Sequence, residues 1–418
     1  MLTVEAAQAR ILAHVPANGV ERVELGAAYG RVLAEDVVAS AELPPWPGSA
    51  MDGFAVRVAD VPGRLRVLET VPAGGVPTRV VGAGEATRIM TGAPVPEGAE
   101  AVVMVEDTST EGEHVVVRVG AKPGQHVRPR GSEIARGATV LRRGQVLGPG
   151  AVGVLAALGQ PSVAVSMRPR VGILSTGDEI VEPGFPLGPG QIWSSNSYAL
   201  MGMVHAAGGL PVHLGNVPDR PEALHAAFAG ATGCDLIVST GGVSVGDYDH
   251  VKDVLTSLGA RIDFWRVAMK PGKPLAFGLY GERPVFGLPG NPVSCMVNFL
   301  QFVRPVIRRM LGDPRPFLPV VEARMTAPWT RRPGRPELVR VRLERREGEL
   351  LATVAGGQGS AHLVGMADAH GFALLDTEGT RLEGVVRVQV FDPGFLGGES
   401  PDYGLASFGG DELHVDGC

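Results

Sequence analysis

Cysteine is scarce in this chain. Only three are present among 418 residues, Cys234, Cys295 and Cys418, and no two of them have the spacing of paired cysteines. This scarcity excludes a zinc knuckle and a disulfide framework and is typical of proteins in a reducing cytoplasm. We therefore expect a cytoplasmic protein.

Long apolar runs and an excess of basic charge are also missing. No run approaches the roughly 20 apolar residues that a membrane span needs. The first residues, "MLTVEAAQARILAHV", lack the basic start of a signal peptide, and their apolar positions recur at helical spacing. The net charge of −6 argues against a wide nucleic-acid footprint. An anion must therefore be bound by a local cluster of basic side chains and backbone N–H groups.

Glycine and proline, in contrast, are abundant, with 59 and 34 residues spread along the chain without a period. They indicate many short turns rather than disorder. From about residue 169, strands such as "VGILST" and "DLIVST" alternate with helical runs, up to "NPVSCMVNFLQFVRPVIRRML". This alternation predicts a mostly parallel α/β sheet that binds ligands beyond the carboxyl ends of its strands.

The segments on both sides of this α/β region are rich in short Val-containing strands, so we expect a multidomain α/β plus β fold. Residues 1–42 and 135–168 each contain a short helix and should pack together as one discontinuous module. The expected modules are 1–42 with 135–168, a β-rich module at 43–134, the α/β module at 169–314, a small β module at 315–396, and a loosely ordered tail at 397–418.

Four segments of the α/β region should open on one edge of the sheet. They are "STGDE" (175–179), "STGGVSVGDYD" (239–249), "MKPGKP" (269–274) and "GLPGNP" (287–292). Together they offer carboxylates, lysines, hydroxyls and glycine N–H groups. We expect a ligand-binding cleft there.

Two of these segments offer groups for an anion. Lys270 and Lys273 lie in a loop stiffened by two prolines, which reduces the entropy lost on binding. An ordinary solvated turn has the same composition. Asn291 is expected at the N-cap of a long helix and Pro292 in its first turn, so the positive helix end faces the same edge. A purely structural cap would look identical.

Gly241 and Gly246 have the spacing of a phosphate-binding loop, and Gly242 also allows a close approach of the backbone. A P-loop continues with Lys-Ser or Lys-Thr, whereas Asp247-Tyr248-Asp249 follows here. A carboxylate beside a phosphate needs a cation between them. Mg²⁺ bound by Asp249 and Asp219 resolves the conflict, although either acid alone could equally be a helix N-cap.

Six stretches, which follow one another in order over about the first three quarters of the chain, strongly resemble the MoeA family of molybdopterin molybdenumtransferases, which includes the E domain of gephyrin. They are "LPPWPGSAMDGFAV", "RIMTGAPVPEGAEAVV", "GILSTGDEI", "LIVSTGGVSVGDYDHVK", "AMKPGKPLAFG" and "GLPGNPVS". The resemblance implies an elongated homodimer with a molybdopterin-binding α/β domain, in which the discontinuous module serves as linker and dimerisation domain.

The resemblance also implies an activity. Molybdate is inserted into adenylylated molybdopterin with Mg²⁺, releasing AMP and molybdenum cofactor. The implied partners are these substrates, a second copy of the chain with the site at the subunit interface, molybdopterin adenylyltransferase and molybdoenzyme chaperones. Nucleic acid and membrane are not among them.

By resemblance, Asp219 and Asp249 are the metal-associated acids, and Lys270 and Lys273 hold molybdate and phosphate. Glu179 matches a position tied to activity. The further substrate-binding positions implied are Gly241, Gly242, Ser244, Arg266, Pro289 and Asn291.

Residues outside the α/β region complete the implied site. Asp52 and Thr91 match positions tied to activity and are expected to reach the cleft from the partner subunit. Arg340 and Ser360 match positions near the oxyanion, with Arg335 as the competing choice for the arginine.

Two residues depart from the family pattern. Glu133 stands where Asp is usual. Arg266 stands where Lys is usual, so a forked guanidinium replaces a single ammonium group. The tail after about Ser400 matches no motif and receives no role.

Two other functions fit parts of the sequence. Adenylyl transfer to molybdopterin is the reaction of smaller relatives that share the α/β module, but those relatives lack the β modules and the "SAMDGFAV" loop. A scaffold like the gephyrin E domain is the non-enzymatic alternative, and the full set of acids and lysines argues against it.

Overall fold

The computed structural model describes residues 1–242 and 250–397, which form two compact units. The smaller unit is Gly19–Ser166, and the larger one combines Met1–Asn18 with the residues from Met167 on. Most of the predicted site residues lie in the larger unit.

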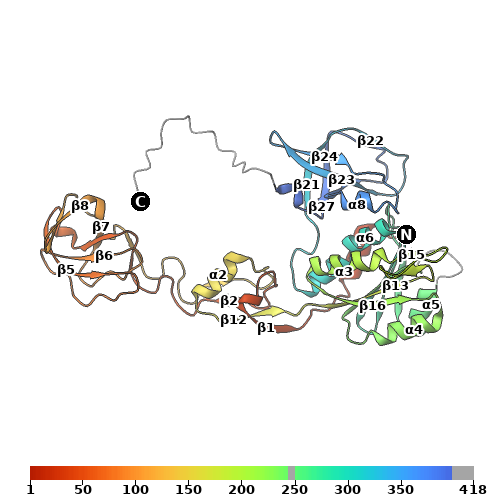
Figure 1. The fold of residues 1–418 in the computed structure, drawn as a ribbon, viewed down its shortest axis with the longest axis horizontal. Helices are drawn as coiled ribbons and strands as arrows, with labels where there is room; N and C mark the ends of the chain where they lie inside the picture. Colours follow the sequence, from red (N-terminus) through yellow and green to blue (C-terminus); the bar gives the residue numbers. More distant parts are fainter. Residues whose placement is uncertain (243–249, 398–418) are drawn as a thin grey trace. The chain divides into compact units, whose positions relative to one another are not determined.

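In the larger unit, the α/β region forms a six-stranded sheet (Figure 1), in the order β16-β13-β17-β20-β19-β18. The first four strands pair in parallel, whereas β19 is antiparallel to both β20 and β18. The sheet is therefore mixed. Its strands are β13 (Arg170–Thr176), β16 (Leu210–Val217), β17 (Leu236–Thr240), β18 (Arg261–Arg266), β19 (Pro274–Tyr280) and β20 (Arg283–Leu288).

Helices cover both faces of this sheet, as predicted (Figure 1). On one face, Leu224 and Phe228 of α4 pack with Val254 and Leu255 of α5 against buried strand residues. On the other face, α3 contacts α6 and α7. The helices are α3 (Ser195–Ala207), α4 (Pro221–Gly230), α5 (His250–Ser257), α6 (Pro292–Asn298), a π-helical segment (Phe299–Val303) and α7 (Arg304–Met310). The long helix expected at the end of this region is thus continuous but contains a π-helical segment.

The predicted common edge of the four loops exists. Because β19 is antiparallel to β20, its first residue, Pro274, lies at the carboxyl end of β20. The lysine-containing loop 269–274 therefore opens beside the loops that follow β13, β17 and β20. A short pair of strands, β14 (Ile180–Val181) and β15 (Ile192–Trp193), borders the same edge.

The C-terminal strands close into a five-stranded barrel, β21-β24-β23-β25-β27. Its core contains Val339, Val341, Ala352, Ala373 and Val388, so the predicted small β module has its own hydrophobic centre. The barrel elements are β21 (Val320–Met325), β23 (Glu337–Arg346), β24 (Glu349–Val354), α8 (Val364–Ala367), β25 (Gly371–Leu375) and β27 (Val385–Val390).

The barrel is tied to the lysine loop through its backbone. Lys270 forms a parallel bridge with Glu337. The Lys270 N–H donates to Pro336 O and the Leu338 N–H donates to Lys270 O, both at 2.9 Å. The barrel strand β23 therefore holds the lysine loop in register.

The N-terminal helix α1 (Val4–Leu12) begins where Thr3 Oγ1 accepts a hydrogen bond from the Ala6 N–H at 3.1 Å. Its buried residues, Ala7 and Ile11, lie on the side that contacts α7 and the π-helical segment. The sequence pattern predicts that residues 1–42, which include this helix, pack with residues 135–168. The structure groups Met1–Asn18 with the larger unit because the apolar face of α1 packs there.

The smaller unit contains a six-stranded sheet in the order β7-β4-β6-β5-β9-β8. Two segments far apart in the sequence also pair there, β1 (Val20–Glu24) with β12 (Ser162–Ser166), beside α2 (Pro149–Ala157). The sheet strands are β4 (Gly53–Val56), β5 (Gly63–Val71), β6 (Glu85–Ile89), β7 (Ala101–Met104), β8 (Thr108–Glu111) and β9 (His114–Val117).

Cys234 and Cys295 are both buried and free. Burial raises the pKa of Cys295 to about 12, so this thiol stays protonated at neutral pH. The third cysteine, Cys418, lies outside the described residues.

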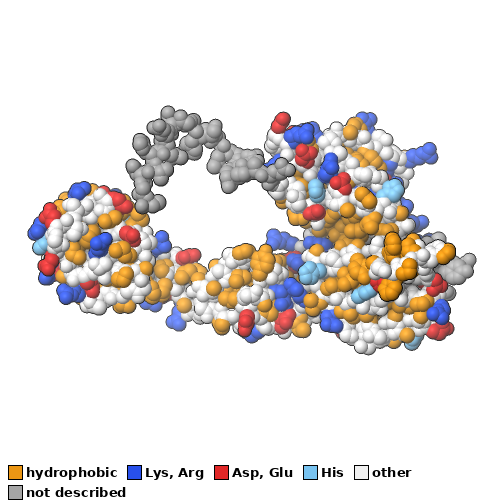
Figure 2. All heavy atoms as spheres, in the orientation of Figure 1, with side chains coloured by type: hydrophobic (Ala, Val, Ile, Leu, Met, Phe, Trp, Pro, Cys, Tyr) orange, Lys and Arg blue, Asp and Glu red, His pale blue; other side chains and the backbone are white. Residues whose placement is uncertain are grey.

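Within the described ranges, no helix combines the length and apolar character needed to cross a membrane. On the face shown in Figure 2, basic and acidic side chains are interspersed over the described parts of both units.

Candidate active site

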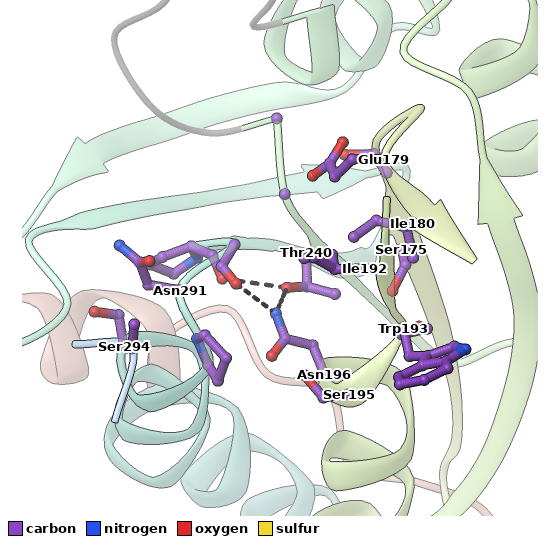
Figure 3. A pocket seen from close by; sticks show the side chains of 18 of the residues that line it. Ser175, Glu179, Ile180, Ile192, Trp193, Ser195, Asn196, Thr240, Asn291 and Ser294 are labelled. Carbon is purple, nitrogen blue, oxygen red and sulfur yellow. Dashed lines mark hydrogen bonds between the residues drawn. The ribbon is translucent and has the colours of Figure 1, made fainter. Parts of the chain in front are cut away.

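A cavity of about 630 Å³ lies at the predicted sheet edge (Figure 3). All four predicted segments contribute to its lining, through Ser175, Thr240, Pro274 and Asn291 with their neighbours. The predicted site residues that line it are Glu179, Asp219, Gly241, Gly242, Pro289 and Asn291. All four predicted segments therefore lie at one edge of the sheet and border one cavity.

Two glycine-containing backbones approach each other closely in the floor of the cavity. Gly241 has φ +95°, and a Cβ there would lie 2.5 Å from Thr176 O. Gly242 has φ +61°. A Cβ on Gly290 would lie 3.8 Å from Gly241 Cα. Only glycine fits Gly241, because both its left-handed conformation and the missing space exclude a side chain.

Asn196 joins the two glycine loops (Figure 3). Its Nδ2 donates to Thr240 Oγ1 at 2.9 Å and to Gly290 O at 2.8 Å. Its Oδ1 and Thr176 Oγ1 are buried and have no hydrogen-bond partner among the described residues. Sequence reasoning assigned Asn196 no role. The Ser-Asn-Ser start of the helix after "GQIW" was the available signal.

The predicted N-cap position of Asn291 is confirmed, with Pro292 in the first turn of α6. The Asn291 side chain accepts no capping hydrogen bond. Instead, the Val293 N–H donates to Ser360 O at 3.0 Å. A loop of the barrel therefore accepts a hydrogen bond from one free amide in the first turn of α6. The same contact holds Ser360 at the edge of the cavity, where its neighbour Ala361 is part of the lining.

Glu179 and Asp219 supply carboxylates to the cavity. Among the side chains that the structure describes, no group of three or more His, Cys, Asp or Glu residues is arranged to hold a metal ion by itself. The lining nevertheless offers oxygen donors from carboxylates and hydroxyls. This donor set suits Mg²⁺, which takes one or two carboxylates together with phosphate and water oxygens. Asp249 and Ser244, both predicted for the site, lie outside the described residues.

The apolar side of the cavity comes from Ile180, Ile192 and Trp193. Trp193 is 53% exposed, and its indole N–H donates to Phe185 O at 2.9 Å. The ring edge is therefore fixed while part of its surface stays accessible, an arrangement suited to stacking against a planar ligand. Sequence reasoning assigned no role to Trp193.

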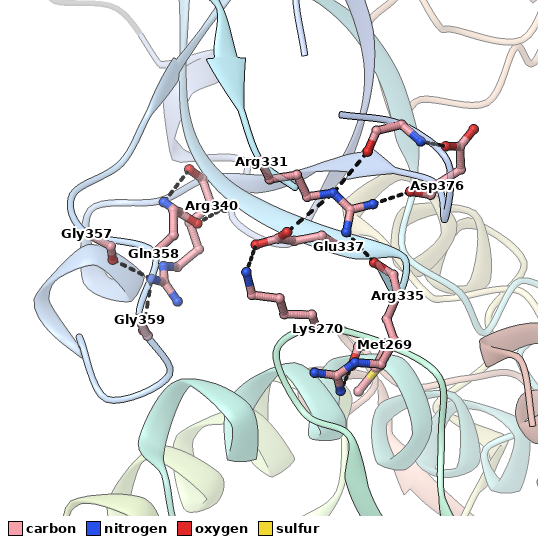
Figure 4. Close-up of polar contacts among 11 residues, drawn as sticks. Met269, Lys270, Arg331, Arg335, Glu337, Arg340, Gly357, Gln358, Gly359 and Asp376 are labelled. Carbon is pink, nitrogen blue, oxygen red and sulfur yellow. Dashed lines mark hydrogen bonds and ion pairs between the residues drawn. The ribbon is translucent and has the colours of Figure 1, made fainter. Parts of the chain in front are cut away.

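Beside the cavity, Lys270 belongs to a group of charged residues that we call the barrel cluster, namely Lys270, Arg331, Arg335 and Glu337 (Figure 4). Lys270 Nζ lies 2.9 Å from Glu337 Oε1. Arg335 Nη1 donates to Met269 O at 2.8 Å. The cluster joins the lysine loop to the barrel by charged side chains as well as by backbone.

Asn298 of α6 holds the lysine loop from the other side. Its Nδ2 donates to Gly272 O at 3.2 Å and to Ser294 O at 2.9 Å. Gly272 has φ +100°, and a Cβ there would lie 2.5 Å from Asn298 Nδ2. The loop that carries Lys270 and Lys273 is thus clamped between α6 and the barrel.

Arg340 is buried in the barrel, with 1% of its surface exposed. Its Nη2 donates to Gly357 O at 2.5 Å and to Gly359 O at 3.1 Å, which holds it against the loop of Ser360 (Figure 4). Its Nε and Nη1 have no hydrogen-bond partner among the described residues. Burial lowers the pKa of Arg340. Arginine nevertheless stays charged near neutral pH, so the unpaired donors favour an anion.

Asp52 and Thr91 meet in the smaller unit, next to the ends of β4 and β6. Asp52 Oδ1 accepts hydrogen bonds from Thr91 N at 2.6 Å and from Thr91 Oγ1 at 2.7 Å. The backbone bond first, and then the hydroxyl bond, hold the pKa of Asp52 below its ordinary value. The two residues that the motifs single out in this unit are therefore direct partners.

The structure does not bring every predicted residue into the cavity lining. Lys270, Lys273, Arg266, Arg340 and Ser360 lie outside the lining of the cavity. Arg266 is exposed at the end of β18. Glu133, the other departure from the family pattern, is exposed in the smaller unit.

Three family models match successive parts of the chain. Residues 2–159 match the MoeA N-terminal region (domains I and II), residues 172–309 match a probable molybdopterin-binding domain, and residues 322–390 match the MoeA C-terminal region (domain IV). The matches follow the order of the smaller unit, the α/β region and the barrel.

Known proteins resemble the chain over most of its length. Molybdopterin molybdenumtransferase 2 of Mycobacterium tuberculosis is 39% identical over 383 residues, which cover 88% of this chain and 94% of the relative. Molybdopterin molybdenumtransferase of a Nostoc species is 43% identical, over 72% of this chain and 71% of the relative. The crystal structure of the molybdopterin biosynthesis MoeA protein of Pyrococcus horikoshii superposes with a TM-score of 0.81 at 31% identity, over 94% of this chain and all of the other.

Proposed function

Since the chain belongs to the MoeA family of molybdopterin molybdenumtransferases, we propose that it inserts molybdate into adenylylated molybdopterin, releasing AMP and molybdenum cofactor. It is a transferase of molybdenum cofactor biosynthesis. The proposal concerns the form of the substrate, the residues that bind it, the use of Mg²⁺, and the cytoplasmic location.

The observation that carries the proposal is the composition of the cavity. Its floor is glycine backbone and hydroxyls, one side is apolar, and two carboxylates stand among its lining residues. A nucleotide-linked pterin has the matching parts: planar rings for the side of Ile192 and Trp193, and a pyrophosphate link for the glycines Gly241 and Gly242.

Molybdate is a tetrahedral dianion and needs several convergent donors. We assign it to the region where the Ser360 loop, Arg340 and the lysine loop meet. The two unpaired donors of the buried Arg340 support this assignment. Arg335, the alternative, already donates to Met269 O, so Arg340 is the stronger choice.

Mg²⁺ fits the oxygen donors of the cavity, with Asp219 and Asp249 as the proposed carboxylate ligands. When bound, it neutralises negative charge on the pyrophosphate link. The chain's own groups then orient the substrate: Asn196 keeps the two glycine loops together, and Lys273 supplies positive charge beside Pro274 at the cavity edge.

Asp52 and Thr91 enter the proposal as residues that act on the site of a second copy of the chain in a homodimer. Their direct pairing keeps the carboxylate ionised and oriented. Molybdopterin adenylyltransferase, as supplier of the substrate, and molybdoenzyme chaperones, as receivers of the product, are the further partners proposed.

The test is molybdate-dependent release of AMP from adenylylated molybdopterin by the purified protein with Mg²⁺. We expect release by the parent protein and a loss of at least about 100-fold in Asp249→Ala and Lys273→Ala, because each removes a charge that binds the reacting groups. Glu349→Gln, which alters an exposed barrel pair with Arg324 at 3.2 Å, is the control and should keep parent activity.

Two results would contradict the proposal. Formation of adenylylated molybdopterin from Mg²⁺-ATP and molybdopterin would indicate the adenylyltransferase reaction instead. Unchanged cofactor synthesis after Asp249→Ala would show that the reaction does not need Asp249 as a metal-associated acid.

A further inference from the structure

Glu337 is a buried carboxylate between two cations (Figure 4). Its side chain is 2% exposed, its Oε1 lies 2.9 Å from Lys270 Nζ, and its Oε2 lies 3.6 Å from Arg331 Nε. A buried carboxylate is strongly unfavourable unless it is paired. Two partners therefore share the charge of one acid, although the motifs assign this residue no role.

The two cations differ in how firmly they are held. The Arg331 side chain is 7% exposed. Its guanidinium donates to Gly379 O at 3.1 Å, to Arg335 O at 2.6 Å and to Asp376 O. Arg331 is thus fixed by three carbonyl oxygens as well as by Glu337. Its positive charge therefore stays beside the Glu337 carboxylate whether or not Lys270 does.

Lys270, in contrast, is free to change partners. Its side chain is 50% exposed, and Glu337 is its ion-pair partner in the part of the chain that the structure describes. A flexible ammonium group that is half exposed can turn to a new anion at low cost. When it does so, Glu337 still keeps Arg331.

The backbone places Lys270 and Glu337 opposite each other. The hydrogen bonds to Pro336 and from Leu338, both 2.9 Å, fix this register, and Asn298 holds the far end of the loop. The position of the ammonium group therefore depends on β23 of the barrel, the strand that also carries Arg340.

We propose that Glu337 is the internal counter-ion of Lys270. It positions the ammonium group before the oxyanion arrives and competes with the anion for that group afterwards. Glu337 is a positioning residue in this scheme because it acts through Lys270. The inference rests on the proposed function, since it takes Lys270 as a group that binds the substrate oxyanion.

Glu337→Gln removes the charge and keeps an oxygen that can accept a hydrogen bond from Lys270. We expect the KM for molybdate to fall about fivefold, because Lys270 no longer has to give up an ionised partner before it binds the anion. The kcat should stay within about twofold, since a uniform gain in binding leaves kcat unchanged. Glu337→Ala removes the positioning bond as well and should lower kcat about tenfold, the size of one lost charge-assisted hydrogen bond.

The double variants separate this role from a structural one. In a Lys270→Ala background, Glu337→Gln should leave the KM for molybdate unchanged, because the partner through which it acts is gone. Asp313→Asn is the matched control, since Asp313 is also buried and lies 2.6 Å from Arg308. It should keep the parent KM even if the protein unfolds at a lower temperature.

The inference is overturned if Glu337→Gln leaves KM unchanged in an active, folded protein, or if its effect persists in the Lys270→Ala background. Should the Glu337 variants fail to fold, a structure of the parent protein with molybdate decides. We expect Lys270 Nζ to contact the anion while Arg331 stays beside Glu337. An ammonium group that remains on Glu337 without touching molybdate would overturn the inference.

Failure of the proposed function looks different. In that case the parent protein shows no molybdate-dependent AMP release. Failure of the inference alone leaves the parent active and sensitive to Lys270→Ala, with a KM that does not respond to the charge on Glu337.

Discussion

The cavity at the sheet edge and the barrel cluster beside it belong to one unit, yet they offer an anion very different surroundings. The cavity presents glycine backbone, hydroxyls and Asn196, whose positions are set by close contacts such as that between Gly241 and Thr176. The barrel cluster presents charged side chains, and its Lys270 already has a counter-ion in Glu337.

The difference is one of mechanism. Backbone donors are neutral and are held by sterics, so they need no counter-ion and change little when the ligand leaves. Charged side chains attract an anion from farther away but must first give up an internal partner. Substitutions that add atoms should therefore disrupt ligand binding in the cavity. Substitutions that change a charge should instead raise or lower the anion affinity of the barrel cluster.

Gly241→Ala should have the largest effect. The new Cβ would lie 2.5 Å from Thr176 O at a backbone φ of +95°, so the loop must move. We expect AMP release to fall at least about 100-fold, because a displacement of about 1 Å is enough to misplace a reacting group. Steady-state kinetics measures it. Gly202→Ala in α3, where a Cβ meets nothing within 4 Å, is the control and should keep full activity.

Two arginine variants test the charged region, namely Arg335 of the barrel cluster and Arg340, which follows Glu337 along β23. Arg340→Met should raise the KM for molybdate about tenfold to 100-fold, since it removes a charge-assisted donor from a buried site. Arg335→Met should raise it by less than about threefold. Molybdate titration of AMP release measures both. The opposite order would assign the oxyanion to Arg335.

The apolar side of the cavity should respond more moderately. Trp193→Ala should weaken AMP binding about tenfold, in line with the 1–3 kcal/mol typical of base–aromatic stacking. Isothermal titration calorimetry measures the affinity. Trp193→Phe, which keeps a ring, should recover most of it, and Trp46→Ala in the smaller unit is the control. Equal AMP affinity in the parent and in Trp193→Ala would mean that the adenine ring does not stack on Trp193.

Asp52 extends the comparison to the smaller unit, because this carboxylate is held by neutral donors instead of cations. Its pKa is lowered in the folded state. Ionised Asp52 therefore stabilises the unit above the ordinary pKa, and this contribution is lost as the pH falls through the lowered value. Thr91→Val should raise the pKa of Asp52 only partway, because the Thr91 N–H still donates to it.

A carboxyl ¹³C chemical-shift titration measures this small effect. Thr78→Val is the matched control, since Thr78 Oγ1 donates to Glu69 at 2.7 Å and lowers the pKa of that acid. It should raise the pKa of Glu69 and leave that of Asp52 where it was. A rise of the Asp52 pKa in both variants would mean that the measured shift does not report the Thr91 contact.

The cavity also separates what sequence reasoning could find from what it could not. The strand ends that form it follow from local alternation of strands and helices, and its glycines follow from their spacing. Asn196, Trp193 and Glu337 were missed because their roles come from partners 44, 8 and 67 positions away in the chain (240 − 196, 193 − 185 and 337 − 270). No local pattern records such pairs.

Periodicity, glycine spacing and ordered motifs are local properties. They were therefore enough to predict the α/β region, the flanking β modules, the common edge of four loops and the membership in the MoeA family. The folded chain was needed to show that β19 is antiparallel, that α1 packs on the larger unit, and that Glu337 of β23 pairs with Lys270. These outcomes depend on which distant surfaces bury each other and on which buried charges must be paired, and both are settled when the whole chain has folded.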